Sequence, residues 1–78
     1  MEQGIKNELG PNIKYYRIRM GFTQEEFSTL LYNEGIMLDR TTLTKIENQT
    51  RGIHDFQIRV FVKVLQVEYT DLFDDISR

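Results

Sequence analysis

Polar and positively charged side chains gather on one face of a short segment in the middle of the chain. The members of this face are Arg40, Thr41, Thr44 and Lys45. On a helix over residues 40–48, Leu43 and Ile46 point the other way, toward a core. Threonine is a mediocre helix former, so its repeated use here indicates that something other than helix stability determines this surface. Guanidinium, ammonium and hydroxyl groups on one exposed face can donate hydrogen bonds to a polar or anionic partner.

The remaining residue types offer little further chemistry. The chain has no cysteine and a single histidine, His54, in a segment predicted to be a loop. Without cysteine there is no disulfide, no zinc finger and no thiol nucleophile. No pairing of a nucleophile with a base and no phosphate-binding loop occurs in the sequence. We therefore predict a protein that is not an enzyme and that needs neither a metal ion nor another cofactor.

Start and stop signals place the helices that must position this polar face. Thr23 and Glu26 have the spacing of a capping box, and Asp39 is a good N-cap for the helix that carries the face. Pro11 suits the first turn of an earlier helix, and Gly21 is a stop signal in the left-handed position. The predicted helices run over residues 11–20, 24–33, 40–48 and 55–66, followed by a short one from residue 70.

The fourth of these segments supports two interpretations. β-Branched residues alternate through residues 58–64, which is a strand signal. Ile58, Phe61 and Leu65 also share one stripe at 100° per residue, as on a helix. We favour a helix capped by Asp55, because no partner strand is visible elsewhere.

Two valines on that helix predict a contact surface. Val60 and Val64 lie one turn apart, opposite the apolar stripe, so we expect them to be exposed. With Tyr69 they would form the surface of a homodimer or bind another partner. The alternative is that Ile5 or a neighbouring helix covers them.

The length and composition predict one small domain. With 78 residues, of which 40% are hydrophobic, the chain can form a single modest core. We expect an all-α bundle of five short helices over residues 10–76, after an N-terminal segment over residues 1–9 that frays, with Thr70 capping the last helix. No run approaches the roughly 20 apolar residues of a membrane span, and the first residues are unlike a secretory signal. We therefore expect a cytoplasmic protein that does not contact a membrane.

The charge is small overall and unevenly distributed. The net charge of −2 and the pI of about 5.3 argue against a protein that coats nucleic acid without regard to sequence. Residues 12–51 nevertheless hold six basic and five acidic side chains, and the acidic excess lies after residue 52. The polar face therefore belongs to a neutral to basic part of the chain.

The second and third predicted helices form a recognisable unit. Two short helices joined by a tight apolar connection, the second with a polar outer face, are typical of a helix-turn-helix. A helix about 10–12 Å across fits the major groove of B-DNA, where its exposed first turns reach base edges. Gln24 lies at the N-terminus of the preceding helix, where free N–H groups favour an anion such as phosphate.

The sequence resembles the Cro/repressor-type helix-turn-helix regulators, also called the XRE family, from about Leu9 to Phe73. The residues that carry the resemblance are Arg17, Gly21-Phe22-Thr23-Gln24-Glu25-Glu26-Phe27, Thr41-Thr42-Leu43-Thr44-Lys45-Ile46-Glu47-Asn48 and Leu65-Gln66-Val67. The resemblance implies a lambda-repressor-like fold, with the second and third helices as the helix-turn-helix, and double-stranded DNA as the partner. The residues to which it assigns DNA contacts are Thr23, Gln24, Arg40, Thr41, Thr44, Lys45, Asn48 and Arg51.

The resemblance also implies a role for each part of this set. Gln24 matches a position that contacts phosphate, and Arg40 to Lys45 match the part of the recognition helix that faces the bases. The segment from Asn48 to Arg51 matches one that holds the sugar–phosphate backbone. Arg17 and Glu47 match a pair that forms a buried ion pair between the first and third helices in many members.

The chain departs from the family pattern in two places. The stretch between Gln24 and Glu47 is several residues longer than in the shortest members, so the pattern does not fix where the Arg40 side chain points. Gln49 stands where glycine is common, so we predict that the third helix is terminated differently, at Gly52.

Two functions follow as hypotheses. The first is a sequence-specific DNA-binding transcriptional regulator, a repressor, that reads the major groove with the helix over residues 40–48. The alternative is a protein-interaction module, such as an antitoxin or an adaptor, that keeps the fold without specific DNA binding. The acidic pI and the apolar pair of Val60 and Val64 favour the alternative. Neither hypothesis includes a small-molecule ligand.

Overall fold

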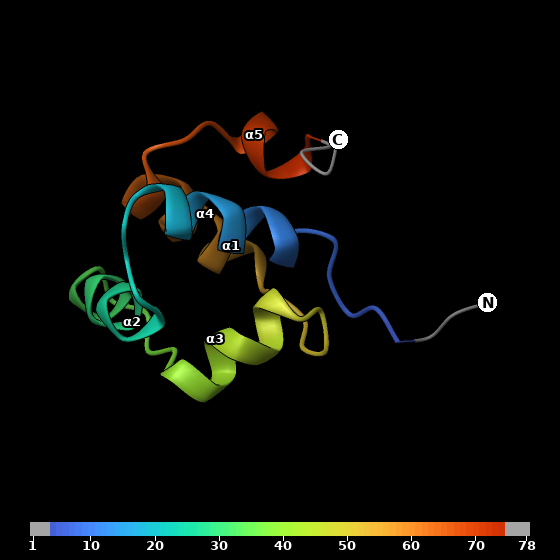
Figure 1. Ribbon diagram of the computed structural model, residues 1–78, viewed down its shortest axis with the longest axis horizontal. Coiled ribbons are helices and arrows are strands. Elements are labelled where there is room, and N and C mark those ends of the chain that lie inside the picture. Colours follow the sequence, from blue (N-terminus) through green and yellow to red (C-terminus); the bar gives the residue numbers. More distant parts are fainter. Residues whose placement is uncertain (1–3, 75–78) are drawn as a thin grey trace.

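A computed structural model of the chain describes residues 4–74, and within this range all regular structure is helical (Figure 1). Its elements are α1 (Gly10–Arg19), α2 (Gln24–Asn33), α3 (Arg40–Glu47), α4 (Asp55–Leu65) and α5 (Tyr69–Phe73). The prediction of an all-α bundle of five short helices is confirmed, and the strand interpretation of residues 58–64 is wrong. Residues 1–3 of the predicted frayed segment, and residues 75 and 76 of the predicted domain, lie outside the described residues.

Helix α1 lies in the middle of the bundle. It packs against α3, α4 and α5, while α2 packs against α3 and α4. Figure 1 shows α3 below α1 and α5 above it. The fully buried side chains between the helices are Ile13, Phe27, Leu31, Leu43, Ile46, Phe61, Leu65 and Leu72. Every helix contributes to this core, and the contacts of α1 with α4 and α5 and of α2 with α4 join the α2–α3 part of the molecule to the α4–α5 part.

Side-chain caps start α2 and α3 as the sequence predicts. The Thr23 Oγ1 atom accepts a hydrogen bond from the Glu26 N–H at 3.0 Å, and the Glu26 Oε1 atom accepts from the Thr23 N–H at 2.8 Å. The Asp39 Oδ1 atom accepts from the Thr42 N–H at 2.8 Å. These local contacts satisfy N–H groups that would have no partner at a helix start.

The N-caps of the last two helices lie one and two residues before the predicted caps. His54, not Asp55, is the N-cap of α4, and Glu68, not Thr70, is the N-cap of α5. In both cases the side chain three residues later reaches back and accepts from the cap N–H. Gln57 does so at 2.9 Å and Asp71 at 2.8 Å. The reaching carboxylate or amide, rather than the capping side chain, therefore sets these two starts.

Left-handed backbone conformations end α1 and α3. Gly21 has a φ of 84°, and the N–H of Phe22 folds back onto the Arg17 carbonyl at 3.0 Å, which confirms the predicted stop. The end of α3 differs from the prediction, because Gln49 itself adopts the left-handed conformation with a φ of 67°. The expected termination at Gly52 is therefore wrong, and a residue with a Cβ atom occupies a conformation that glycine adopts at lower cost.

The segment before α1 is docked against the end of α3. The Asn7 Nδ2 atom donates to the carbonyls of Ile46 at 3.0 Å and Arg51 at 2.7 Å. A Cβ atom at Gly10 would collide with the Ile46 carbonyl oxygen, so only glycine permits this approach of α1 to α3. The segment over residues 4–9, which the sequence predicts to fray, thus contacts the domain from Lys6 onward.

The predicted exposure of two valines on α4 is wrong. Val60 and Val64 are partly buried and pack against the core. The reason is that α4 contacts α1, α2 and α5, which cover more of its circumference than one apolar stripe requires. Tyr69 at the start of α5 is 48% exposed. No helix in residues 4–74 combines the length and apolar character that crossing a membrane requires.

Candidate nucleic-acid interface

The connection between α2 and α3 is anchored rather than loose. Ile36 and Leu38 are buried, whereas Met37 between them is 77% exposed. The Ser28 hydroxyl on α2 donates to the Leu38 carbonyl at 2.6 Å. The longer connection noted in the sequence therefore has two apolar anchors and one hydrogen bond to α2. These contacts hold the residue before the Asp39 cap and so place the start of α3.

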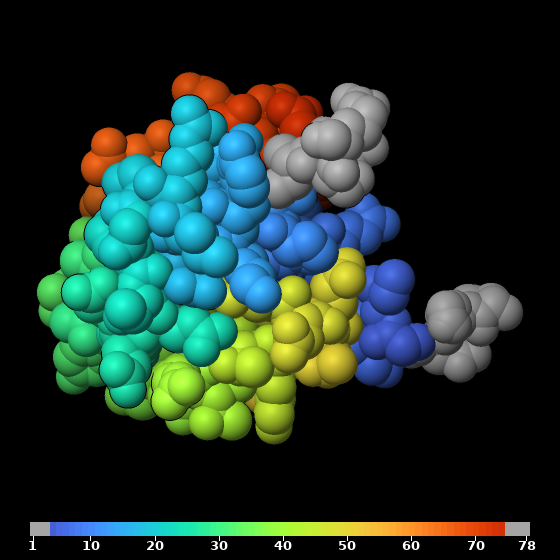
Figure 2. Space-filling model, in the orientation of Figure 1, coloured from blue at the N-terminus to red at the C-terminus, as the bar shows by residue number. Residues whose placement is uncertain are grey.

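The outer face of α3 is open to solvent along most of its length. Arg40, Thr41 and Lys45 are exposed, while Leu43 and Ile46 on the opposite face are fully buried. In Figure 2 the yellow-green atoms of α3 lie along the lower edge of the molecule. Three of the four residues of the predicted polar face are thus free to meet a partner.

Residues after α3 extend this surface. Asn48, the C-cap of α3, and Arg51 in the following loop are both exposed. The pKa of Asp39 lies below its ordinary value of 3.8, mainly because the backbone and side chain of Thr42 hydrogen-bond to its carboxylate. The positive charges of Arg51 and Lys45 lower it further. Arg51 and Lys45 therefore place positive charge within Coulombic reach of the Asp39 carboxylate at the start of α3.

Arg17 and Glu47 form a buried pair between α1 and α3. The Arg17 Nε atom lies 2.7 Å from Glu47 Oε2, and Arg17 Nη2 lies 3.0 Å from Glu47 Oε1. The third donor of this guanidinium, Nη1, reaches the carbonyl of Phe22 at 2.8 Å. Their side chains are 9% and 2% exposed. A planar guanidinium bound at three points fixes the rotation of α3 relative to α1.

Gln24 connects this pair to the outer face of α3. Its Nε2 atom donates to Glu47 Oε1 at 3.1 Å, and its Oε1 atom accepts from the Thr44 hydroxyl at 3.0 Å. The sequence predicts that both Gln24 and Thr44 are available to DNA, but the structure holds each of them in an internal contact and leaves each partly exposed. The chain from Arg17 through Glu47 and Gln24 to Thr44 is called the polar relay below.

The sequence predicts the Arg17–Glu47 part of the polar relay, which the structure shows, but it misses the link through Gln24 to Thr44, although one signal for that link exists. Arg40, Thr44 and Glu47 have the spacing i, i+4 and i+7, which puts them on one stripe of a helix. This stripe runs from the exposed face of α3 to the buried pair. No local pattern predicts that Gln24, twenty residues before Thr44, lies beside the stripe.

A shallow hollow of about 380 Å³ lies where α2 and α3 begin. Its lining residues are Arg17, Thr23, Gln24, Glu25 and Arg40. Gln24, predicted to lie near a phosphate, thus shares one space with Arg40, predicted to lie near a base, and with Thr23, predicted to contact DNA. The structure brings the predicted residues of the two helices together at this corner.

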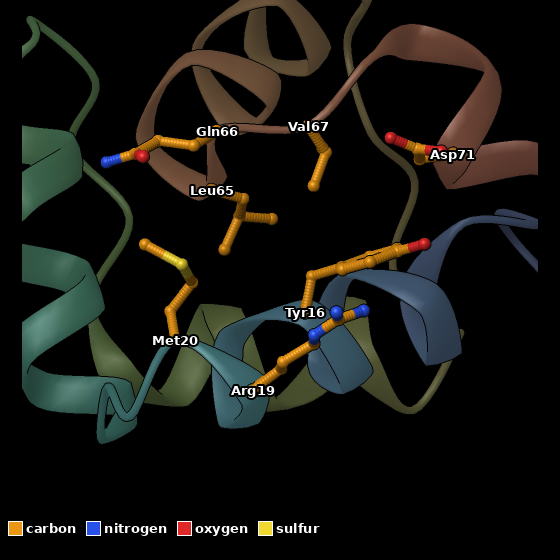
Figure 3. A pocket seen from close by; sticks show the side chains of 7 residues that line it. All are labelled: Tyr16, Arg19, Met20, Leu65, Gln66, Val67 and Asp71. Carbon is orange, nitrogen blue, oxygen red and sulfur yellow. The ribbon is translucent and has the colours of Figure 1, made fainter.

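A second hollow, of about 410 Å³, lies on the other side of α1 (Figure 3). Tyr16 from α1 and Asp71 from α5 line it, together with Leu65 and Val67. Partial burial, followed by the charge of Asp71, raises the pKa of Tyr16 above its ordinary value. Helix α1 separates this hollow from α3, and it therefore does not belong to the polar face.

No protein-family model matches the chain, and no curated protein matches it. An assignment of function therefore depends on the arrangement of α2 and α3 and on the chemistry of their shared surface.

Proposed function

We propose that the chain is a sequence-specific DNA-binding protein of the XRE type, a cytoplasmic transcriptional repressor that places α3 in the major groove. One observation carries this proposal: the outer face of α3 presents Arg40, Thr41 and Lys45 to solvent, while the opposite face is fully buried. A helix with one free polar face at the edge of a molecule can enter a groove about 12 Å wide. The buried pair and Gln24 hold it in a defined rotation.

The proposed roles follow from the positions of the side chains. Arg40 and Lys45 donate to base edges, with guanine O6 and N7 as the best acceptors. Arg51 and Asn48, beyond the end of α3, bind the phosphate backbone. Thr41 lies in the first turn of α3, which comes closest to the groove floor in this docking geometry.

Selection of bound sequences from a random pool of double-stranded DNA tests the proposal. Enrichment of one sequence is expected, and its affinity should fall by about 0.9 log units per log unit of salt for each phosphate neutralised. A folded protein, verified by circular dichroism, that enriches no sequence would refute specific DNA binding.

Single substitutions separate the two proposed classes of contact. Arg40→Ala and Lys45→Ala should change the preferred sequence, whereas Arg51→Ala should weaken binding to all sequences alike. Arg59→Ala, on the exposed side of α4, is the matched control and should leave binding unchanged. Equal losses on cognate and random DNA for all three interface variants would contradict the assignment of α3 as the recognition helix.

A homodimer through Val60, Val64 and Tyr69 is part of this proposal. Since both valines are partly buried, Tyr69 offers the largest free apolar surface of the three. A twofold dimer would bind two half-sites about one helical turn apart, so the selected sequence should be palindromic. A protein that sediments as a monomer with and without the selected DNA would contradict the dimer.

The second candidate function is a protein-interaction module such as an antitoxin or an adaptor. The observation that favours it is the exposure of large apolar side chains, with Met37 at 77% and Phe73 at 60%. The net charge of −2 also reduces attraction to DNA. A stoichiometric partner that co-purifies with the chain, together with no enriched DNA sequence, would support this function over the first.

A further inference from the structure

We infer that Glu47, which is buried, determines which hydrogen-bonding groups Gln24 and Thr44 present to DNA. The inference rests on the proposed function and concerns the specificity of the same surface. Through the polar relay, the buried carboxylate makes Gln24 a donor and Thr44 an acceptor. Glu47 is therefore a positioning residue, and Thr44 is a further residue, beside Arg40 and Lys45, that discriminates between bases.

The first step is the state of the carboxylate. Both oxygens of Glu47 accept hydrogen bonds from the Arg17 guanidinium, at 2.7 and 3.0 Å. Arginine keeps its charge in proteins, and an ionised carboxylate only accepts hydrogen bonds. Any third group that binds Glu47 must consequently be a donor.

The second step is the orientation of the Gln24 amide. The atom 3.1 Å from Glu47 Oε1 is the amide nitrogen, and the amide oxygen faces Thr44. The opposite orientation would place the amide oxygen against the carboxylate oxygen, with two acceptors in contact and no hydrogen between them. The carboxylate thus selects one of the two amide orientations.

The third step is the hydroxyl of Thr44. Its Oγ1 atom lies 3.0 Å from Gln24 Oε1 and 3.0 Å from the Arg40 carbonyl oxygen. Both neighbours are acceptors, so they share the single hydroxyl hydrogen, and the lone pairs of the oxygen stay available. Gln24 keeps a second amide hydrogen that Glu47 does not use. The exposed parts of the polar relay are therefore one donor at Gln24 and one acceptor at Thr44.

This polarity predicts the groups that the surface accepts. Phosphate oxygens only accept, so they bind the free N–H of Gln24. The lone pairs of Thr44 require a donor, and the major-groove donors are the amino groups of adenine N6 and cytosine N4. The base facing Thr44 is accordingly adenine or cytosine. Guanine and thymine present acceptors in the major groove instead, and these cannot donate to the lone pairs of Thr44.

Nuclear magnetic resonance of the free protein tests the polarity without DNA. The two side-chain amide protons of Gln24 should be well separated in chemical shift and exchange slowly with water. The exposed Gln66 provides the internal control, with protons of ordinary shift and fast exchange. A Gln24 amide that behaves like that of Gln66 would overturn the inference, whatever DNA the protein binds.

Sequence selection with Thr44 variants tests the readout. Thr44→Val keeps the shape but removes the lone pairs, and it should reduce the preference for adenine or cytosine at one position about tenfold. Thr44→Ser should retain that preference. Thr29→Val is the matched control, because the Thr29 hydroxyl bonds the carbonyl four residues earlier, at 3.1 Å, as Thr44 does. An unchanged preference in Thr44→Val would overturn the inference while leaving the proposed function intact.

Removal of the carboxylate tests the role of Glu47 itself. The double variant Arg17→Met, Glu47→Leu replaces the buried pair with apolar side chains of similar size. It should lose the preference at the Thr44 position although Thr44 is present, and keep the preferences set by Arg40 and Lys45. A selected site identical to that of the unaltered chain would show that Glu47 has only a structural role. If this variant does not fold, the Thr44 variants and the resonance measurement still decide.

Discussion

Helix α1 sends two polar side chains in opposite directions, and they hold their neighbours in different ways. Arg17 binds a carboxylate on α3, whereas Asn12 binds backbone carbonyls at the end of α5. The Asn12 Nδ2 atom donates to the carbonyl oxygens of Leu72 at 2.6 Å and Asp74 at 2.7 Å. Both anchoring residues are buried, with 7% of Arg17 and 8% of Asn12 exposed. One contact is a charged pair of two side chains, and the other is a neutral amide on a backbone.

This difference determines what each contact requires of the sequence. Any residue has a backbone carbonyl, so α5 can change its side chains without losing the contact with Asn12. The contact with α3 requires a carboxylate at Glu47 and a guanidinium at Arg17. Loss of either side chain would leave the other as a buried charge without a partner. The helix proposed to bind DNA is therefore the one whose placement depends on specific side chains.

The largest effect is expected when the charged contact is cut on one side. Glu47→Ala should lower the free energy of unfolding by about 3–5 kcal/mol, because the Arg17 guanidinium stays buried without a counter-charge. Thermal unfolding followed by circular dichroism measures this loss. The double variant Arg17→Met, Glu47→Leu is the control and should lose far less, since no buried charge remains. An unchanged melting temperature for Glu47→Ala would show that the pair is not effectively buried in solution.

A smaller effect is expected at the neutral contact. Asn12→Ala should lower the free energy of unfolding by about 1–3 kcal/mol, the range for buried groups that lose their hydrogen-bond partner. The loss is smaller than for Glu47→Ala because the groups left without a partner are neutral carbonyls rather than a buried charge. Urea unfolding measures the change, and Asn33→Ala at the exposed end of α2 is the control. If Asn12→Ala lowered the free energy of unfolding as much as Glu47→Ala does, the charged and the neutral contact would not differ in strength.

Much of the fold could be predicted because its signals are local. The capping box at Thr23, the Asp39 cap and the Gly21 stop each depend on residues within about one turn of helix, and all three are in place. The wrong predictions depend on tertiary contacts. The burial of Val60 and Val64 comes from helices packed on three sides of α4, which the period of α4 alone does not contain.

The surface of α3 shows the same limit. The exposure of Arg40, Thr41 and Lys45 follows from helical period once the helix is placed. The internal contacts of Gln24 and Thr44 do not, because they join residues twenty positions apart. The sequence also does not predict that the left-handed conformation of Gln49 ends α3, since glutamine is not a residue that typically adopts a positive φ.

A third local contact, the Asp39 cap at the start of α3, should respond to acid, whereas the neutral Asn12 contact should not. The pKa of its carboxyl is lowered by the hydrogen bonds from Thr42, followed by the charges of Arg51 and Lys45. A lowered pKa in the folded state stabilises the fold above the ordinary value of 3.8, and this stabilisation is lost as the pH falls through the folded pKa. The neutral Asn12 contact has no such dependence.

Asp39→Asn isolates this effect, because asparagine also caps helices well. The stability difference between the unaltered chain and this variant should be largest near neutral pH and should shrink below pH 3.8. Urea unfolding between about pH 2 and 7 measures it. The effect should be smaller than that of Asn12→Ala, because Asp39 is exposed. A difference that stays constant across this range would show that the charge of Asp39 does not contribute.

The smallest effect is expected at an exposed pair of charges, which tests whether charge or burial makes the Arg17 contact strong. Lys63 Nζ lies 2.7 Å from Glu34 Oε1, as close as the nearest atoms of the buried pair, but the Lys63 side chain is 68% exposed. A double-mutant cycle of Lys63→Ala and Glu34→Ala should give a coupling of about 0–1 kcal/mol, because water screens the pair. Salt at 1 M, where the screening length is about 3 Å, should remove that coupling. If the exposed pair coupled as strongly as Arg17 and Glu47, distance alone would explain both, and the buried position of Glu47 would carry no special weight.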